Sequence, residues 1–145
     1  VGAICWLPDI VGWARVVSDF PRPGGTFYIR EGHPAMWCLD WDEESLLSIV
    51  EPYFGGTGPI RYEEATTYAG DGKMNNTVQY ECKHGLGEIL TALIEAGLRI
   101  EHFREHEFCD WQGIPHLRQG EDGRWRLPDR PERLPLMFSI RAVKG

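Results

Sequence analysis

The 145-residue sequence has no apolar run of the roughly 20 residues that a membrane helix needs. It also has no basic-then-apolar leader of the kind that directs secretion. Its four cysteines are widely spread and form no Cys-x-x-Cys pair, so a disulfide framework is not indicated. We therefore expect a cytoplasmic protein with reduced thiols.

The sequence also lacks an excess of basic residues. Its 22 Asp and Glu outnumber its 15 Lys and Arg, which gives a formal net charge of −7. A negatively charged protein repels polyanions, so the charge predicts no nucleic-acid partner. The absence of a long apolar run likewise predicts no membrane partner. Internal repeats and low-complexity segments are absent too.

The composition is that of a folded globular domain, with 42% hydrophobic and 26% charged residues. A chain of this length is long enough for one hydrophobic core. The sequence begins with Val1 rather than Met, and its first seven residues are apolar, as in the end of a strand. We therefore expect residues 1–145 to be a single partial domain, a piece of a longer polypeptide.

The segment 18–34 predicts a helix end, a tight turn, a strand and an abrupt stop. Pro21 and Pro23 cannot continue a helix, and Gly24-Gly25 suits a sharp reversal. The β-branched and aromatic run 26–29 then predicts a strand. A helix followed at once by a strand is half of a βαβ unit, which predicts an α/β fold with a parallel sheet covered by helices.

Ligands bind beyond the carboxyl ends of strands in such sheets. The residues that follow the predicted strand are Glu31, Gly32 and His33, so we expect these three to lie at the binding site.

The other elements follow from spacing and capping residues. Asp9 is expected in the first turn of a helix whose apolar face, from Ile10 to Phe20, packs on the sheet. Asp42 is expected to cap a second helix that ends at Pro52. Trp41 and Leu46 would form a hydrophobic staple there. The remaining expected elements are a helix from Leu86 to a stop at Gly97, strands at 60–68, 77–82, 98–107 and 134–143, and a hairpin turn at Asp122-Gly123.

Residues 51–83 form a long excursion between the second and third helices. It carries three tyrosines, Tyr62, Tyr68 and Tyr80. Lying over the carboxyl edge of the sheet, it would act as a substrate lid. An ordinary hairpin explains the same pattern, and both interpretations stay open.

Four segments, taken in order, resemble class I S-adenosylmethionine-dependent methyltransferases. The element Pro23-Gly24-Gly25-Thr26-Phe27-Tyr28-Ile29, with the helix before it, resembles the entry to the fifth strand of that family. Residues 2–9 resemble the loop after the fourth strand. Residues 80–89 and 134–139 resemble the late helix and last strand of one bacterial branch. The likeness covers nearly the whole chain.

The resemblance implies a Rossmann-like sheet in the order 3-2-1-4-5-7-6, of which this chain supplies strands five to seven, the last antiparallel between the other two. The chain would be the C-terminal, substrate-side half of an enzyme that methylates a small molecule. No Gly-x-Gly-x-Gly cofactor loop is present. We therefore expect the chain alone to bind S-adenosylmethionine weakly or not at all, and to be inactive.

The resemblance also implies roles for individual residues. Cys5, Trp6 and Leu7 would lie beside the cofactor, although Trp6 also suits packing against the first helix. His33 is the candidate catalytic base or substrate contact, and the alternative is that it caps the strand. The implied substrate-binding residues are Glu31, Gly32, His33, Trp37, Tyr68, His84 and Trp111. His84 alternatively bonds only the start of the helix that follows it.

Three other hypotheses come from the residues themselves. The chain could be a non-catalytic α/β ligand-binding or interaction module. A zinc site is disfavoured, because His102 and His106 on one strand would be about 13 Å apart at ~3.3 Å per residue. No metal is therefore expected. The edge at 26–30 should recruit a second copy or be covered by residues 1–7.

Overall fold

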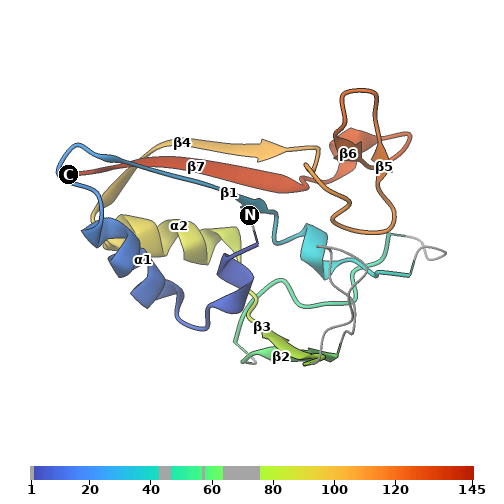
Figure 1. Ribbon diagram of the computed structural model, residues 1–145, viewed down its shortest axis with the longest axis horizontal. Helices are drawn as coiled ribbons and strands as arrows, with labels where there is room; N and C mark the ends of the chain where they lie inside the picture. Colours follow the sequence, from blue (N-terminus) through green and yellow to red (C-terminus); the bar gives the residue numbers. More distant parts are fainter. Residues whose placement is uncertain (1, 43–46, 57, 64–75) are drawn as a thin grey trace.

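The computed structural model describes residues 2–42, 47–56, 58–63 and 76–145 (Figure 1). The fold is α/β. Its centre is a sheet of three strands, β1 (Thr26–Gly32), β4 (Leu98–His106) and β7 (Met137–Lys144). Two helices, α1 (Ile10–Asp19) and α2 (Leu86–Glu95), cover one face of this sheet, as Figure 1 shows. Among the described helices, none is both long and apolar enough to cross a membrane.

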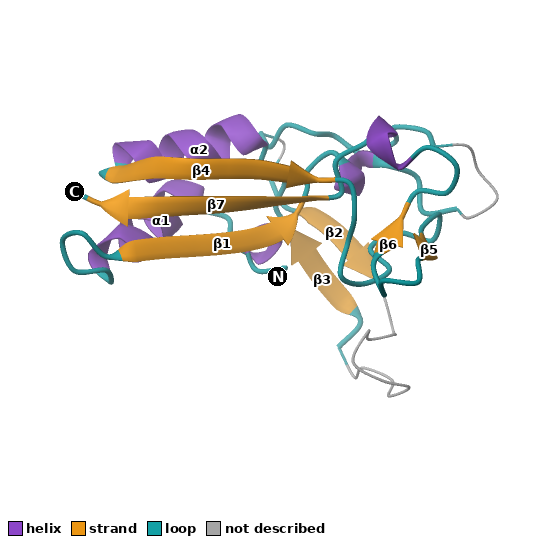
Figure 2. Cartoon of the chain, turned by 90° about the horizontal axis from the view of Figure 1, so that it is seen from above, coloured by secondary structure: helices purple, strands orange, loops and turns teal. Residues whose placement is uncertain are grey.

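The strand order is β1-β7-β4, and β7 is antiparallel to both neighbours (Figure 2). β1 and β4 therefore run in the same direction but do not touch. The βαβ argument predicted a parallel ladder, and this prediction is wrong, because the last strand is inserted between the two parallel strands. The resemblance predicted an antiparallel last strand in the middle, and the pairing confirms that order.

Both helices begin and end largely as their sequences predict. The Asp9 carboxylate accepts a hydrogen bond from the Gly12 amide at 2.8 Å and caps α1. Gly97 has φ +87° just beyond α2, a conformation that glycine adopts without strain. The helices bury one apolar stripe each against the sheet, and the buried core there comprises Ile4, Ile10, Ala14, Ile89, Ala92, Leu93, Leu98, Phe138, Ile140 and Ala142.

Phe20 does not belong to this core, contrary to the prediction from helical spacing. Its side chain is 85% exposed. The regular helix ends at Asp19, so Phe20 lies outside the stripe that faces the sheet.

A second apolar cluster lies beyond the ends of the strands. It joins the turn η2 (Met36–Cys38) to the small hairpin of β5 (Arg118–Gln119) and β6 (Trp125–Arg126). A further turn, η3 (Pro131–Arg133), precedes β7. The hairpin reverses at Gly123, with φ +77°, as predicted. The buried members are Met36, Leu39, Cys109, Ile114, Leu117, Leu127, Leu136 and Met137.

The N-terminal segment is not the end of a strand. Residues Ile4–Trp6 form a 3-10 turn, η1. Gly2 has φ +79°, and the amides of Gly2 and Ala3 both donate to the carboxylate of Glu31. Backbone groups that are bound by a side chain cannot join a ladder, so the apolar composition of this segment was misleading.

The prediction of a helix between Asp42 and Pro52 is wrong for the residues of this segment that the structure describes. Leu47 to Glu51 are not helical, Ile49 bridges Leu39, and the Val50 amide donates to the Cys38 carbonyl at 2.8 Å. Ile49 and Val50 are exposed. Residues 43–46, and with them the staple to Leu46, lie outside the described residues.

The excursion at 51–83 contains a separate two-stranded hairpin. β2 (Ile60–Glu63) pairs with β3 (Val78–Glu81) in antiparallel register. β3 is shorter than the predicted strand at 77–82, and β2 coincides with the described start of the predicted strand at 60–68. Residues 64–75, including Tyr68, lie outside the described residues, so neither the lid nor the plain-hairpin interpretation of this part is tested.

Candidate functional site

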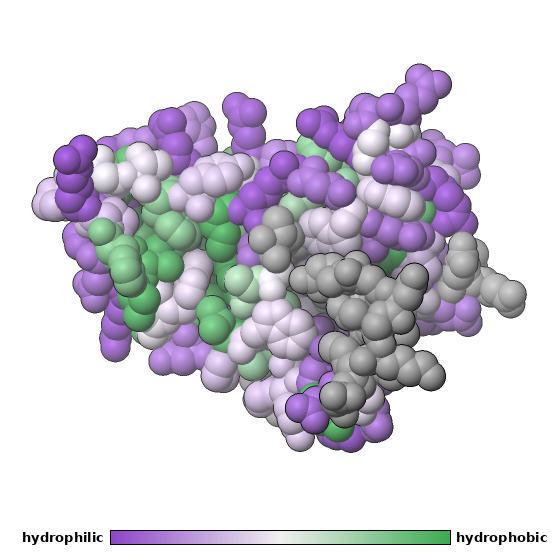
Figure 3. Space-filling model, viewed as in Figure 1, coloured by the Kyte–Doolittle hydropathy of each residue, from purple (hydrophilic) through white to green (hydrophobic). Residues whose placement is uncertain are grey.

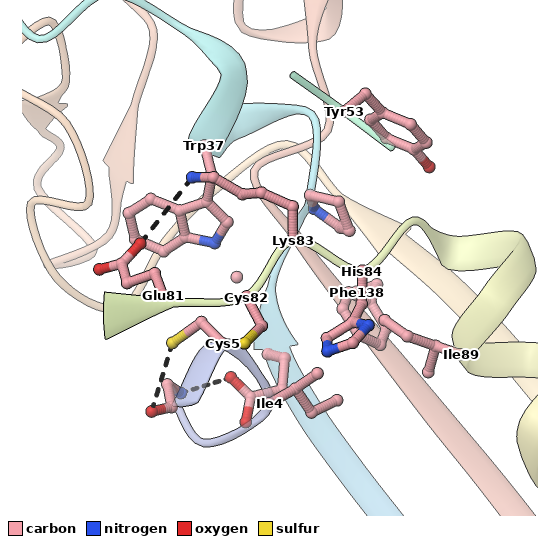
Figure 4. Close-up of a pocket in the computed structure, with 14 residues that line it drawn as sticks. Ile4, Cys5, Trp37, Tyr53, Glu81, Cys82, Lys83, His84, Ile89 and Phe138 are labelled. Atoms are coloured by element: carbon pink, nitrogen blue, oxygen red, sulfur yellow. Dashed lines mark hydrogen bonds and ion pairs between the residues drawn. The ribbon is translucent and has the colours of Figure 1, made fainter. Parts of the chain in front are cut away.

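The candidate site is a small pocket at the carboxyl end of β1, where η1 and the end of β3 meet it (Figure 4). Its volume is about 50 Å³. Pockets that bury a drug-sized ligand hold roughly 300–1,000 Å³, so this one fits only part of such a ligand. The lining residues are Gly2, Ile4, Cys5, Glu31, Gly32, Pro34, Trp37, Tyr53, Glu81, Cys82, Lys83, His84, Ile89 and Phe138.

Glu31 is the first anchor of this site. Its side chain is buried, and its two carboxylate oxygens accept hydrogen bonds from the amides of Gly2 and Ala3, the latter at 3.0 Å. A buried carboxylate is costly unless it is hydrogen-bonded, and these two amides meet that need. Glu31 therefore fixes the N-terminal segment against the end of β1.

His84 is the second anchor. Its Nε2 lies 2.7 Å from the carbonyl oxygen of Leu7, to which it donates, and its Nδ1 lies 3.1 Å from a carboxylate oxygen of Glu88. Between the two anchors, the Cys82 amide donates to the Cys5 carbonyl at 2.7 Å. The segment 2–7 is thus held at three points, and it forms one wall of the pocket.

Gly32 and Trp37 form the opposite wall. A Cβ at Gly32 would lie 2.8 to 3.0 Å from three atoms of the Trp37 indole, so the ring rests directly on the strand backbone. Trp37 also stacks on Trp41, with ring centroids 6.0 Å apart and planes 18° from parallel. Only glycine permits this contact, which places an aromatic surface at the pocket.

Charged groups line the third side. The Lys83 ammonium lies 3.8 Å from a carboxylate oxygen of Glu81 and 5.6 Å from the ring centroid of Tyr62. Burial raises the pKa of the Tyr62 hydroxyl. Burial, with the nearby carboxylates of Glu81 and Glu31, raises the pKa of the Cys5 thiol to about 11. Cys5 is therefore protonated at neutral pH and is a poor nucleophile.

His33 lies next to this pocket but does not line it. Its Nδ1 accepts from the Ala35 amide at 3.1 Å, and its Nε2 donates to Glu105 at 3.0 Å. Burial lowers the pKa of the ring, against the opposing effect of Glu105. With both nitrogens bound to protein groups, His33 is held as a neutral ring that closes the turn after β1.

The structure thus brings together five of the predicted site residues, Cys5, Glu31, Gly32, Trp37 and His84. Trp6 is 47% exposed, and neither it nor Leu7 lines the pocket. Trp111 packs on the second apolar cluster instead. Tyr68 lies outside the described residues.

Sequence reasoning missed Glu81, Cys82 and Lys83 as pocket residues. They lie in the segment 80–89 that carries part of the resemblance, directly before His84, but an alternating strand end gives no signal that its charged residues face a pocket. Within the described residues, no three His, Cys, Asp or Glu side chains gather as a metal site would require.

The sequence matches no protein-family model and no curated protein. Two solved structures share its fold, one from Listeria monocytogenes and one from Mesorhizobium loti, both assigned to the S-adenosylmethionine-dependent methyltransferases. The first has a TM-score of 0.50 at 16% identity and covers 99% of this chain. The second has a TM-score of 0.50 at 19% identity and covers 98%.

This chain therefore has an α/β fold that resembles that of S-adenosylmethionine-dependent methyltransferases. At these identities the likeness concerns the fold. The chain spans 58% of the length of each of the two structures.

Proposed function

We propose that this chain provides the acceptor-facing part of an enzyme that transfers a methyl group from S-adenosylmethionine to a small molecule. In this proposal β1, β4 and β7 correspond to strands five, six and seven of the methyltransferase sheet. The observation that carries it is the insertion of β7, antiparallel, between two strands of the same direction. The pocket lies at the carboxyl end of β1, where ligands bind in open α/β sheets.

The pocket lining holds two carboxylates, those of Glu31 and Glu81, and one ammonium, that of Lys83, which lies 3.8 Å from Glu81. The aromatic ring of Trp37 is the lining group that suits a positively charged ligand atom. The cofactor, when bound, would supply an electrophilic methyl group on a sulfonium. The protonated thiol of Cys5 does not compete for that methyl group, because a thiol is a far weaker nucleophile than a thiolate.

Positioning and exclusion of water are the main tasks of a protein in a direct displacement. The segment 2–7, held by Glu31 and His84, and the Trp37 ring provide two fixed walls for this purpose. A general base is required only where the attacking atom carries a proton. His33 was the candidate for that role, and its two protein hydrogen bonds favour a positioning role instead.

The chain alone should bind the cofactor weakly and be inactive. The pocket holds about 50 Å³, and the sequence has no Gly-x-Gly-x-Gly loop. Calorimetric titration of the 145-residue chain with S-adenosylhomocysteine should give no micromolar affinity. A micromolar dissociation constant would show that these residues grip the whole cofactor, which contradicts the assignment to an acceptor-facing half.

A methyl-transfer assay on the natural protein that contains this chain tests the role of the pocket directly. Trp37→Ala should lower methyl transfer at least tenfold, because it removes one wall of the site. Trp111→Ala is the matched control, since Trp111 packs on the second cluster and should change activity little. Equal losses in the two variants would mean that the pocket is not the site of reaction.

A second candidate function is a non-catalytic ligand-binding or interaction module. Two observations favour it: the pocket is small, and both ring nitrogens of His33 are hydrogen-bonded to protein groups. It predicts that the natural protein binds a ligand but does not transfer a labelled methyl group from S-adenosylmethionine to any compound in a small-molecule extract.

A further inference from the structure

The three-stranded sheet has a second face, which α1 and α2 do not cover (Figure 2). Ile140 belongs to the core beneath the helices, and successive side chains of a strand point to opposite faces, so Ser139 points away from the helices. Arg30 of β1 and Arg104 of β4 lie directly beside Ser139 in the two ladders. Residues paired in this way share a face, so these three side chains form one row on the open face.

The open face is rich in arginine. Figure 3 shows hydrophilic residues along this side of the molecule, which is uppermost in that view. Six of the 15 Lys and Arg residues lie on this face or on the hairpin beside it, namely Arg30, Arg99, Arg104, Arg124, Arg126 and Arg141. In a chain of net charge −7 this is a local positive patch. A helix packed here would need apolar residues beneath it, so the charged side chains indicate a solvent-facing surface.

Two of the six arginines have no carboxylate partner. The other four are paired, Arg30 with Asp110, Arg99 and Arg141 both with Glu101, and Arg126 with Asp122. Within the residues that the structure describes, no ion pair involves Arg104 or Arg124, and both side chains are exposed. The guanidinium groups of these two residues are therefore available to an anion from outside the chain.

A buried polar pair lies beside these arginines. Ser139 is 8% exposed, and its hydroxyl oxygen lies 3.0 Å from Nε2 of His106. A hydroxyl both donates and accepts, so a serine that accepts from the ring nitrogen keeps its own proton for another acceptor. The open face thus contains a buried hydroxyl donor between two arginines.

Three guanidinium groups surround His106. Burial lowers the pKa of its ring, and the positive charges of Arg30, Arg104 and Arg124 lower it further, against the opposing charge of Asp110. These arginines come from β1, from β4 and from the turn of the β5–β6 hairpin. Segments that are far apart in sequence therefore place positive charge around one point of the sheet.

The ring of Phe108 holds two of these guanidinium groups in place. The guanidinium carbons of Arg30 and Arg124 lie 5.3 and 4.1 Å from its centroid, which is cation–π distance. The hairpin of β5 and β6 rises at this end of the sheet, so the arginines lie in a corner (Figure 1). The Nε of Arg30 is buried and has no acceptor among the described residues. Such a donor is rare in folded proteins and points to an acceptor supplied by a ligand.

We propose that this corner binds a phosphate group as a dianion, either free phosphate or a phosphate monoester, through Arg30, Arg104, Arg124 and the hydroxyl of Ser139. Neighbouring strands lie about 4.8 Å apart, so the backbones of Arg30 and Arg104 are about 10 Å apart and their side chains reach a group above Ser139 from two sides. A phosphate offers several acceptor oxygens and a charge near −2, which suits several guanidinium donors at once. A planar carboxylate, with one charge and two oxygens, satisfies only one of them.

This site is independent of the proposed methyl transfer and of the sheet edges. None of its residues lines the pocket. Ser139 lies on β7, the middle strand, and further strands could join only at the outer edges of β1 and β4. In the described residues no backbone hydrogen bond joins segment 2–7 to residues 26–30. The expectation that the N-terminal segment covers the edge of β1 is therefore wrong for residues 2–7.

An NMR titration of the isotope-labelled chain with phenyl phosphate above pH 7, at constant ionic strength, tests the site. The amide of Ser139 and the ring of His106 should shift and saturate at millimolar ligand. The pKa of His106 should rise, because a bound dianion favours the charged ring. Phenyl sulfate has a similar shape but one negative charge, and should bind about fivefold more weakly or worse. Inorganic phosphate separates the two sources, since equal affinity indicates free phosphate and weaker binding indicates an ester.

Arg104→Ala and Arg124→Ala should each weaken phenyl phosphate about fivefold or more. Both residues are exposed and have no ion pair in the described chain, so the variants should fold, which their NMR spectra would verify. Arg99→Ala is the matched control, because Arg99 lies on the same face but pairs with Glu101 near the other end of β4, and its affinity should stay within about twofold.

Three results would overturn the proposal. The first is the absence of saturable shifts at millimolar phenyl phosphate. The second is the same shifts with sodium chloride of equal ionic strength, which would show charge screening alone. The third is an equal loss in Arg99→Ala and Arg104→Ala, which would mean that the anion responds to the general charge of the face and not to this corner.

Discussion

Gly32→Ala tests the wall of the pocket at which strand backbone and aromatic ring meet. The added Cβ would lie 2.8, 2.9 and 3.0 Å from Cζ2, Nε1 and Cε2 of Trp37. If the ring tilts away, it loses its stack on Trp41. Overpacking of this kind costs about 1–3 kcal/mol. We expect that loss in the free energy of unfolding.

Urea unfolding, followed by tryptophan fluorescence, measures this loss. The fluorescence of the native state should also change, because the indole of Trp37 must move. In thermal unfolding, the midpoint temperature should fall by roughly 2–4 °C for each kcal/mol of stability lost, the value for a chain of this size.

Gly87→Ala is the matched control. Gly87 lies within α2, and nothing would lie within 4 Å of its added Cβ. Because Gly87 is the second residue of the helix, replacing it should stabilise the protein by at most about 0.5–1 kcal/mol, the value for a glycine in the middle of a helix. If Gly32→Ala unfolds at the same urea concentration as the original chain and leaves the native fluorescence unchanged, Trp37 does not rest on this strand, and the pocket wall is misassigned.

Three further predictions concern the cap, the turn and the thiol. Asp9→Ala should lower the free energy of unfolding by about 1 kcal/mol, measured in urea, because the Gly12 amide loses its acceptor; no loss would mean that α1 does not begin there. Folding lowers the pKa of His33, so the unfolded chain takes up its proton first, and the free energy of unfolding should fall as the pH drops below about 6.5. His33→Asn should flatten that part of the pH profile, and an unchanged slope would exclude His33 as its source. Iodoacetamide should alkylate Cys5 slowly at pH 8 and much faster as the pH approaches its pKa of about 11. Rapid labelling at pH 7 would contradict a half-buried thiol beside two carboxylates.

Local signals predicted local structure well. The Asp9 cap, the turn after Pro23 and the helical spacing that ends at Gly97 each depend on residues that are close in sequence, and each appears in the structure. No local pattern predicted that β7 would enter between β1 and β4. Strand order depends on contacts between residues a hundred positions apart, and only the family resemblance supplied it.

The helix expected after Asp42 shows that a local pattern can also predict an element that does not form. Its apolar spacing is helical, but the Val50 amide bonds the carbonyl of Cys38, which lies on a distant turn. A tertiary hydrogen bond of this kind has no signature in a local window.

The sequence predicted that the end of the strand at Glu31 lies at the binding site, and in the structure Glu31 lines the pocket. That its carboxylate holds the N-terminal segment depends on a contact across 28 residues. Glu81 and Lys83 were missed because charged residues on a short hairpin are usually solvated, and only the fold turns these two toward Cys5.

An NMR titration of the isotope-labelled chain with S-adenosylhomocysteine tests the central proposal most directly, because it detects binding far weaker than calorimetry does. We predict that millimolar ligand shifts the amide signals of Cys5, Gly32 and Cys82, while those of Trp125 and Arg126 in the distant hairpin stay unchanged. Pocket amides that do not move at millimolar ligand, or shifts that occur only elsewhere, would contradict the assignment of this pocket to methyl transfer.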